Sequence, residues 1–545
     1  MSGFRSIVDP SLARRYRADG WWGDETISDH VRRAARDTPT KAAYLTPEST
    51  MTFAELDDAA DRVASTLIGH GVRPGDRLAV RLPDGPPIHA VFVGCERAGV
   101  TVVGIGARSG DRELRHLITK TGATWFISHA MHRGEDQSAV VDVLRADGIA
   151  VQHHMVLPSD VRGTWQAIVD GELSRAPLLP ASAFLARAIG PDDLFLINST
   201  SGTTGLPKCV THFQNRWVYF HRKAAAHGEL TSDDVFFSAV PVPFGFGLWT
   251  SHTTPLILGA STVQLERFDT ATAIDMIEQH RVTVLCCVST QFIMLLNDPD
   301  IERRDLSSLR VMFTGGEAVP YERALRFEQT TGATVLQFYG SNETGLLSGT
   351  TLVDTPEQRL RTAGRTVPEM NVRLFDVRVD VTAAGRGQPG CIGPATSTGY
   401  LDDDAANAEL FTDSGHMLMA DICAVDADGY LSVVGRTSDI IIRGGKNISA
   451  AQVEDEVGTH PAVALAAAVP VPDATFGERV GVYVELRPGT SLSFDGLLDH
   501  LRSRGLSREL FPEHFVVMDE LPRSSGAKVA KGTLKQDAQT RFVTT

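Results

Sequence analysis

Short apolar runs alternate with amphipathic stretches along most of the chain. Runs such as Arg77–Leu82, Thr101–Ile105 and Thr124–Ser128 have the length of buried strands, and helical patterns separate them. Strand runs that alternate with helical patterns are typical of parallel sheets covered by helices. The pattern therefore predicts an α/β fold with helix-covered sheets.

Four of the apolar runs end in small or polar residues. They are Leu194–Ile197, Val282–Val288, Leu309–Phe313 and Val335–Tyr339. In open α/β sheets, ligands bind beyond the carboxyl ends of the strands. The four strand ends therefore predict one composite binding site.

A smaller domain is expected after the turn-rich stretch Gly385–Gly390. The run Val480–Leu486, a helical pattern near Leu497–Arg504 and the run Phe515–Met518 predict a second α/β unit. A chain of 545 residues also exceeds what a single core holds. We expect a large domain over residues 1–437 and a small domain over residues 438–545.

Composition narrows the class of protein. Hydrophobic residues make up 42% and charged residues 22%, as in ordinary globular proteins. The net charge of −15 argues against nucleic acid or an anionic membrane as the main partner. None of the six cysteines forms a C-x-x-C pair, so neither a zinc site nor a disulfide framework is indicated. No signal peptide or membrane-spanning run is recognisable, which predicts a cytoplasmic protein.

The stretch Ser199–Lys208, S-T-S-G-T-T-G-L-P-K, follows one of the strand ends. Its order of glycines and lysine does not fit the G-x-x-x-x-G-K-[ST] phosphate loop. Glycines that expose backbone N–H groups, hydroxyl donors and the charge of Lys208 nevertheless suit phosphate. A flexible Ser/Gly surface loop explains the stretch equally well when it is considered alone.

Three further motifs occur with this loop. They are Y-G-S-N-E (Tyr339–Glu343), Asp421 followed by Gly435-Arg436, and P-R-S-S-G-A-K (Pro522–Lys528). Together the four motifs resemble those of the adenylate-forming enzymes, which include acyl- and aryl-CoA ligases, nonribosomal adenylation domains and firefly-type luciferases. The resemblance covers nearly the whole chain and is greatest to ligases of aryl, alicyclic or medium-chain acids.

The resemblance implies a mobile C-terminal domain and a two-step reaction. A carboxylate first attacks the α-phosphate of ATP and gives acyl-AMP and pyrophosphate. The thiol of coenzyme A then attacks the acyl carbon and releases AMP. The implied small-molecule partners are ATP, Mg²⁺, CoA and a carboxylic acid, and the implied assembly is a monomer or a homodimer.

The resemblance also implies a role for individual residues. Lys528 and Lys208 would be catalytic, Glu343 would hold Mg²⁺, and the hinge would be Ser438. The implied nucleotide-binding residues are Thr200, Ser201, Gly202, Thr203, Thr204, Gly205, Gly316, Glu317, Ala318, Gln337, Tyr339, Asn342, Asp421 and Arg436. The implied acid pocket comprises Phe244, Gly245, Gly315, Gly340, Ser341 and Leu346. The implied CoA-binding residues are Arg443, Gly444, Gly445 and Lys446.

The acid is partly specified by the stretch Pro241–Gly247. Relatives that activate amino acids carry an aspartate here, whereas this chain has no acidic residue in the stretch. An α-amino acid is therefore not expected. Phe244 and the small residues around it predict a roomy apolar pocket for a bulky alicyclic, aryl or medium-chain acid.

Five positions depart from the family pattern: Cys209, Asn342, Ala420, Ser438 and Ala527. Cys209 stands where the family has glycine, and a positive φ there would cost a cysteine about 1–3 kcal/mol. We therefore expect Cys209 to stiffen the loop and to slow adenylation. Lys528 lies six positions after Pro522, as in the family, although an alignment on Ser525-Gly526 would place Ala527 there instead.

Four functions are compatible with these features. The first is a carboxylate–CoA ligase, and the second is a partial enzyme that makes only the thioester from a preformed acyl-adenylate. A third enzyme would pass the adenylate to an amine or a carrier protein. The fourth is a non-catalytic nucleotide-binding protein.

Overall fold

The computed structural model describes residues 7–200, 206–316, 319–436, 440–443, 446–473, 475–504, 506, 508–524 and 528–542. For Arg436, Ile440, Lys446, Asn447 and Glu509 it describes the backbone alone. The chain divides into two compact units. The first unit comprises Met1–Cys286, Ser341–Gly345 and Gly393–Leu410, and the second comprises Cys287–Gly340, Leu346–Ile392 and Phe411–Thr545.

The central sheet of the first unit carries the phosphate-loop candidate. Its middle strands are parallel and its outer strands β9, β10 and β12 are antiparallel. In sheet order the strands are β10 (Glu172–Leu173), β9 (Ile168–Val169), β8 (His153–Leu157), β5 (Trp125–His129), β3 (Arg77–Arg81), β4 (Thr101–Gly104), β11 (Leu196–Ser199) and β12 (Cys209–His212).

A second set of strands in the first unit is parallel except for β2, which pairs antiparallel with β1. Its strands are, in order, β15 (Val284–Cys286), β13 (Val235–Ser238), β14 (Ser261–Val263), β1 (Ala42–Leu45) and β2 (Thr50–Thr52). Strands such as β4, β14 and β15 are buried at every position, as expected where helices cover both faces of a parallel sheet.

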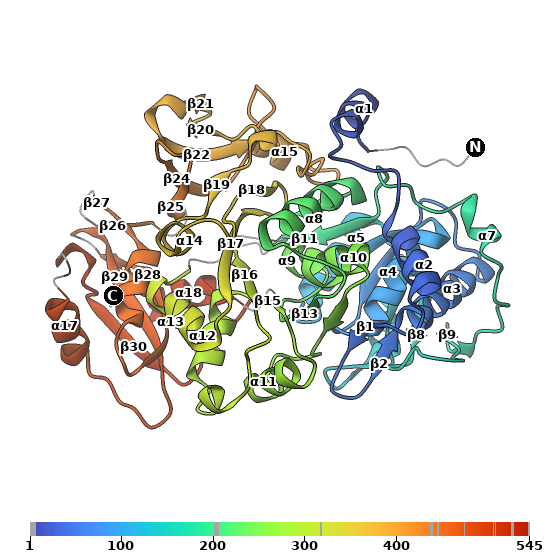
Figure 1. The fold of residues 1–545 in the computed structure, drawn as a ribbon, viewed down its shortest axis with the longest axis horizontal. Coiled ribbons are helices and arrows are strands. Elements are labelled where there is room, and N and C mark those ends of the chain that lie inside the picture. Colours follow the sequence, from blue (N-terminus) through green and yellow to red (C-terminus); the bar gives the residue numbers. More distant parts are fainter. Residues whose placement is uncertain are drawn as a thin grey trace. The chain divides into compact units, whose positions relative to one another are not determined.

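Helices cover these sheets, and α2, α3 and α4 lie together beside β1 (Figure 1). Helices α2 and α3 begin at capping boxes, in which Thr26 and Thr52 bond the third residue of the helix. The helices of the first unit are α1 (Pro10–Ala18), α2 (Ile27–Asp37), α3 (Phe53–Gly69), α4 (Pro86–Ala98), α5 (Asp111–Thr121), α6 (Gln137–Ala146), α7 (Ser182–Leu185), α8 (Gln214–Gly228), α9 (Gly245–Gly247), the π-helix η1 (Leu248–Thr253), α10 (Thr254–Leu258), α11 (Thr270–Gln279) and α15 (Asp404–Leu410). A short hairpin joins β6 (Met131–His132) and β7 (Glu135–Asp136).

The second unit begins with a small group of strands whose ends carry predicted site residues. Its strands β16 and β17 are parallel, and β18 and β19 are antiparallel. The bounds are β16 (Val311–Gly315), β17 (Thr334–Ser341), β18 (Gly345–Gly349) and β19 (Arg365–Thr366). The accompanying helices are α12 (Ser289–Asn297), η2 (Ile301–Arg303), α13 (Tyr321–Thr331), α14 (Pro356–Arg361) and η3 (Pro368–Met370).

Residues 373–436 form an antiparallel sheet, which differs from the helix-covered parallel sheets expected before residue 437. Tight turns such as Asp426–Gly429, between β24 and β25, suffice because antiparallel neighbours need no crossover helix. Its strands are β21 (Val379–Asp380), β20 (Arg373–Asp376), β22 (Arg386–Cys391), β24 (Asp421–Val425) and β25 (Leu431–Arg436), with β23 (Met417–Leu418) paired to β22 and the 3-10 turn η4 (Thr382–Ala384) beside β20.

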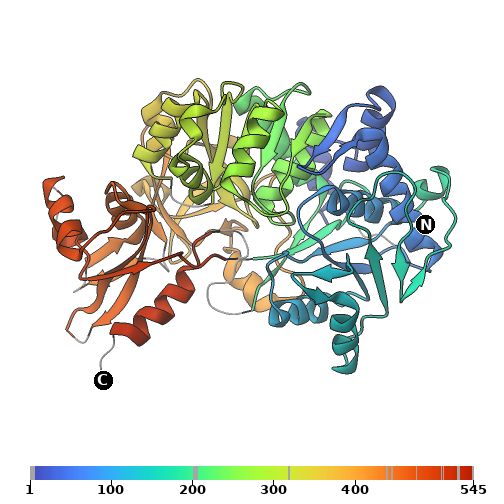
Figure 2. The ribbon, with the colours of Figure 1, turned by 90° about the horizontal axis from the view of Figure 1, so that it is seen from below.

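The C-terminal residues form a mixed sheet with its own apolar core, as expected for a small α/β domain. In Figure 2 the red helix α18 lies against the orange strands of this sheet. Its strands are β27 (Lys446–Ser449), β26 (Ile440–Arg443), β29 (Gly477–Leu486), β28 (Val463–Asp473) and β30 (His514–Met518). Its helices are α16 (Ala450–Gly458), α17 (Phe494–Ser503), η5 (Arg508–Leu510) and α18 (Lys531–Phe542).

Within the described residues, no helix is both long and apolar enough to span a membrane.

Candidate active site

The phosphate-loop candidate is held at its base by the antiparallel pair β11 and β12. Ser199 pairs with Cys209, and the backbone N–H of Thr200 donates to the carbonyl of Lys208 at 3.0 Å. The backbone N–H of Lys208 in turn donates to Thr200 Oγ1 at 3.2 Å. The loop thus leaves and re-enters the sheet at adjacent positions. The predicted residues Ser201, Gly202, Thr203, Thr204 and Gly205 lie outside the described residues.

Cys209 is a regular strand residue, so the strain expected of it was wrong. It is the first residue of β12, and its φ is not among the positive values of the chain. Its side chain is 2% exposed and belongs to an apolar cluster with Ile197, Leu117 and Leu401. Burial raises the pKa of the thiol to about 11. Cys209 therefore contributes to the core beneath the loop and carries no left-handed backbone cost.

Lys208 and Glu343 meet at one aromatic side chain, that of Tyr400. The Tyr400 hydroxyl donates to Glu343 Oε1 at 2.8 Å, and the Lys208 Nζ lies 4.9 Å from the centre of the Tyr400 ring. Lys208 also lies 4.0 Å from a carboxylate oxygen of Glu409, which is largely exposed. Lys208, which the sequence predicts for phosphate, and Glu343, which it predicts for Mg²⁺, thus contact the same tyrosine side chain in the first unit.

The turn that carries Glu343 is fixed by Ser341. The Ser341 hydroxyl accepts from the backbone N–H groups of Glu343 and Thr344, at 3.2 and 3.1 Å. The backbone N–H of Ser397 donates to the Glu343 carbonyl at 2.7 Å. Ser341 was predicted in the acid pocket, and the structure gives its hydroxyl a role in orienting the Glu343 backbone.

A buried chain of hydrogen bonds links this turn to the strand beneath the loop. Arg216 donates to His212 Nδ1 at 2.7 Å, and His212 Nε2 bonds Asn198 Oδ1 at 2.7 Å. Because arginine always donates, Nδ1 accepts and Nε2 carries the proton. Burial and the charge of Arg216 hold the pKa of His212 well below its usual value. The imidazole is therefore neutral with a fixed tautomer.

Asn198 in turn fixes the orientation of the Asn342 side chain. The two amides bond each other in both directions, at 3.1 Å from Asn198 Nδ2 and 2.5 Å from Asn342 Nδ2. Asn198 Nδ2 also donates to the carbonyl of Pro243 at 2.8 Å. Asn342, which departs from the family pattern, thus has a matching amide on β11.

Arg216 also binds the Glu343 turn directly. Its guanidinium donates to the carbonyls of Asn342 and Glu343, each at 3.0 Å, and to that of Ala395 at 2.7 Å. The side chain is 1% exposed. Removal of such a group would leave several buried acceptors unpaired.

The stretch Pro241–Gly247, which the sequence predicts beside the acid pocket, packs tightly in the first unit. A Cβ at Gly106 would lie 2.9 Å from the Phe244 ring, so this ring covers the end of β4. A Cβ at Gly245 would lie 2.9 Å from Asn342 Oδ1 and 3.2 Å from Trp217. Glycine at 245 therefore lets the Asn342 amide and an indole approach the backbone closely.

In the second unit, three of the predicted nucleotide-binding residues are neighbours. The Tyr339 hydroxyl donates to Asp421 Oδ2 at 2.7 Å, and Asp421 pairs with Arg436 in the ladder of β24 and β25. Burial, Cys423 and Asp421 raise the pKa of Tyr339 well above its usual value. Gln337 was also predicted to bind the nucleotide. Its amide donates instead to the carbonyl of Arg359 at 2.8 Å.

Lys528 reaches the Thr-Gly-Gly-Glu segment of the same unit. Its Nζ donates to the carbonyl of Gly316 at 2.7 Å, and a Cβ at Gly316 would lie only 2.8 Å from this nitrogen. Gly316 has φ +76°, so glycine suits both the backbone and the approach of the lysine. Gly315 ends β16, Gly340 lies near the end of β17, and Leu346 is buried in β18.

Other predicted residues are less informative. Arg443 pairs with Glu513 in the C-terminal sheet, so its guanidinium is already engaged. The described residues exclude Glu317, Ala318, Ser438, Gly444, Gly445 and Ala527, and the side chains of Arg436 and Lys446.

Comparison with known families resolves the class of protein. The family model described as "AMP-binding enzyme" matches residues 31–401, and "AMP-binding enzyme C-terminal domain" matches residues 452–528. The chain belongs to the AMP-binding enzyme family. The resemblance to adenylate-forming enzymes is thereby confirmed, as is the α/β fold with a large N-terminal domain and a small C-terminal one.

Relatives within the AMP-binding family cover the chain almost completely. A medium-chain fatty-acid–CoA ligase of Escherichia coli is 29% identical, over 97% of this chain and 93% of its own. A 3-[(3aS,4S,7aS)-7a-methyl-1,5-dioxo-octahydro-1H-inden-4-yl]propanoyl:CoA ligase of Mycobacterium tuberculosis is 31% identical, over 94% and 98%. The solved anthranilate CoA ligase AuaEII, in complex with anthranoyl-AMP, shares the fold with a TM-score of 0.83, 22% identity and coverage of 95% and 98%.

The residues of this AMP-binding enzyme fit Mg²⁺ held jointly with a nucleotide. The described part of the chain holds no cluster of three or more His, Cys, Asp or Glu that could bind a metal unaided. Glu343 is a half-buried carboxylate beside Lys208. Mg²⁺ commonly takes one or two protein carboxylates together with substrate phosphates and water. Glu343 would be the protein ligand of such a Mg²⁺.

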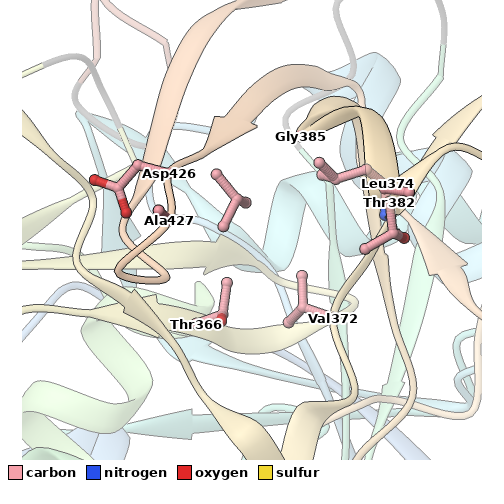
Figure 3. Close-up of a pocket in the computed structure, with 9 residues that line it drawn as sticks. Thr366, Val372, Leu374, Thr382, Gly385, Asp426 and Ala427 are labelled. Carbon is pink, nitrogen blue, oxygen red and sulfur yellow. The ribbon is translucent and has the colours of Figure 1, made fainter.

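A separate cavity of about 390 Å³ lies in the second unit, between the turn at Asp426 and the 3-10 turn at Thr382 (Figure 3). Thr366 and Val372 line it between these two sides. None of the predicted site residues lines this cavity, so it is no part of the candidate active site.

The sequence analysis missed four residues of the site: Asn198, His212, Arg216 and Tyr400. Asn198 could have been noticed as an amide in an otherwise apolar strand run. His212 and Arg216 lie four residues apart and bond each other, but their other partners, like those of Tyr400, are distant in the sequence and gave no local signal.

We expect Cys209→Gly to lower the free energy of unfolding by about 1–3 kcal/mol, since it removes a buried side chain and loosens a strand. Cys209→Ala, which keeps Cβ, should cost less. Urea denaturation of both variants measures the difference. Equal or greater stability of Cys209→Gly would contradict the placement of Cys209 in the core.

Asn198→Leu should destabilise the first unit by about 1–3 kcal/mol, because His212 Nε2–H and the Pro243 carbonyl lose their buried partner. Asn342→Ala is the matched control and should cost less, since Asn342 is only half-buried. Fluorescence-detected unfolding in urea compares the two, and Trp217, stacked on His212 at 5.6 Å, is a local reporter. A harmless Asn198→Leu would show that the network does not stabilise the site.

Proposed function

We propose that this AMP-binding enzyme is a carboxylate–CoA ligase that forms an acyl-adenylate, then an acyl-CoA, with release of pyrophosphate and AMP. The convergence of Lys208 and Glu343 on Tyr400 is the observation that carries this proposal. It joins a cation suited to phosphate with a carboxylate suited to Mg²⁺, directly beside β12, the strand that leaves the phosphate loop.

In the first half-reaction, Lys208 would bind the β- and γ-phosphates together with the N–H and hydroxyl groups of residues 200–205. When bound, Mg²⁺ would neutralise charge on the phosphates, with Glu343 as its protein ligand. The turn that carries Glu343 is fixed before the substrate arrives, by Ser341, Arg216 and the Asn198–Asn342 pair. Electrostatic stabilisation is strongest where such groups are preorganised.

Lys528 would stabilise the charge that develops between the attacking carboxylate and the α-phosphate. Its contact with the Gly316 carbonyl supports this role, because it places a flexible ammonium group at the end of β16. Asp421 would accept the ribose hydroxyls, and Tyr339, which already bonds Asp421, would hold this carboxylate in place. Adenine would lie against Tyr339 and residues 316–318.

In the second half-reaction, a thiol would reach the acyl carbon past the segment Arg443–Lys446 after rotation about Ser438. This step is supported by the two relatives of similar length, both of which are CoA ligases by name. The acid is proposed to be bulky alicyclic, aryl or medium-chain. This class is supported by the absence of an acidic residue in Pro241–Gly247.

The direct test incubates the protein with ATP, Mg²⁺, CoA and a panel of medium-chain, aryl, fused-ring and α-amino acids. Mass spectrometry then follows AMP, acyl-AMP and acyl-CoA. We expect equal amounts of AMP and acyl-CoA with at least one acid of the first three classes. Acyl-AMP that accumulates despite CoA would refute the thiol acceptor, and no acid-dependent AMP would refute the ligase.

We expect Lys528→Ala to lose acyl-AMP synthesis by about 100-fold or more, as when one stabilising group is removed from a preorganised site. Conversion of synthetic acyl-AMP and CoA to acyl-CoA should change much less, because that step forms no bond at the α-phosphate. Lys535→Ala, which removes an ammonium group from α18, is the control. Equal losses in both half-reactions of a folded Lys528→Ala protein would remove Lys528 from the adenylation step.

A further inference from the structure

We infer that Tyr400 is a positioning residue for adenylation, which orients the Glu343 carboxylate for the metal through its hydroxyl and supports the Lys208 ammonium with its ring. The inference rests on the proposed function. It adds a residue that carries no charge and would not itself touch the reacting atoms.

The backbone around Tyr400 is attached to the strand that leaves the phosphate loop. The N–H of Leu401 donates to the Cys209 carbonyl at 2.8 Å, and the N–H of Thr211 donates to the Gly399 carbonyl at 3.1 Å. Tyr400 forms a bridge with Val210. The position of the tyrosine is therefore set by β12, the strand that directly follows Lys208.

A second anchor holds Tyr400 from the other side. The Asn407 amide brackets the tyrosine backbone, accepting from its N–H and donating to its carbonyl, both at 2.8 Å. Asn407 lies in α15. Tyr400 is thus fixed between a strand and a helix, so its side chain has a defined origin from which to reach Glu343.

The hydroxyl of Tyr400 is a dependable donor. A tyrosine hydroxyl is protonated at neutral pH and can therefore donate a hydrogen bond. The proton points to Glu343 Oε1 at 2.8 Å. With one carboxylate oxygen fixed by this bond, the other would be available to a cation. Hydrogen-bond partners of metal ligands commonly contribute 10- to 100-fold to metal affinity.

The ring of Tyr400 contacts Lys208 rather than Glu343. The Lys208 ammonium lies 4.9 Å from its centre, within the range of a cation–π contact. Tyr400 thus contacts both Lys208 and Glu343, and no hydrogen bond or ion pair is found between these two residues, both of which the structure describes. Hydroxyl and ring should therefore be separable by mutation.

The test measures binding of Mn²⁺ in the presence of α,β-methylene-ATP, by electron paramagnetic resonance, for the full-length protein and its variants. Tyr400→Phe should weaken Mn²⁺ binding about 10-fold in this complex, while affinity for the metal-free analogue changes less than about 2-fold. Tyr400→Leu should in addition weaken binding of the metal-free analogue by roughly 3-fold, because the cation–π contact is lost.

Tyr430 offers a matched control within the same chain. Its hydroxyl donates to Asp354 Oδ1 at 2.6 Å, and the guanidinium of Arg365 lies 4.8 Å from its ring centre. The chemistry copies that of Tyr400, but no proposed substrate-binding residue is involved. Tyr430→Phe should leave Mn²⁺ binding, analogue binding and both half-reactions unchanged.

Two activity measurements separate this inference from the proposed function. Tyr400→Phe should need about 10-fold more Mg²⁺ for half-maximal acid-dependent pyrophosphate exchange, and it should make acyl-CoA from synthetic acyl-AMP at the wild-type rate.

An unchanged Mn²⁺ affinity of Tyr400→Phe would overturn the inference even in an active ligase. Loss of both half-reactions together, with a lower melting temperature, would likewise show a merely structural role. A wild-type protein without exchange would refute the ligase, while the Mn²⁺ titration would still decide the role of Tyr400.

Discussion

The candidate site depends on the hydrogen bonds of one buried side chain, the guanidinium of Arg216. It binds the carbonyls of residues 342, 343 and 395 and fixes the tautomer of His212, which in turn orders Asn198. Segments that are far apart in the sequence thus share one cation that cannot lose its proton. Because a charge of this kind tolerates burial only when it is well paired, the segments and the guanidinium stabilise one another.

The charged side chains of the candidate site are held in place differently in the two units. In the first unit, the neutral side chain of Tyr400 contacts both the Lys208 ammonium and the Glu343 carboxylate. In the second, a phenol bonds the Asp421 carboxylate, and Lys528 reaches a glycine whose missing side chain leaves it space. The charged groups proposed to bind substrate are therefore contacted mainly by uncharged side chains or by backbone, which do not neutralise them.

Much of the fold was predictable because strand ends and motifs are local signals. The runs that became β3, β5, β11, β16 and β29 were all expected, and so was the position of the loop directly after β11. The antiparallel sheet of residues 373–436 and the network of Arg216 were not, since each depends on partners that the sequence does not place. Cys209 shows the same limit. Its chemistry suggested strain, but its strand position and apolar neighbours decide its role.

All six cysteines of the chain are buried. Burial raises the pKa of Cys209 to about 11 and that of Cys423 to about 12. Thioester exchange requires a thiolate, and these side chains supply almost none at neutral pH. A protein that makes acyl thioesters on CoA would thus be protected from acylating itself, and from mixed disulfides with the thiol that it consumes.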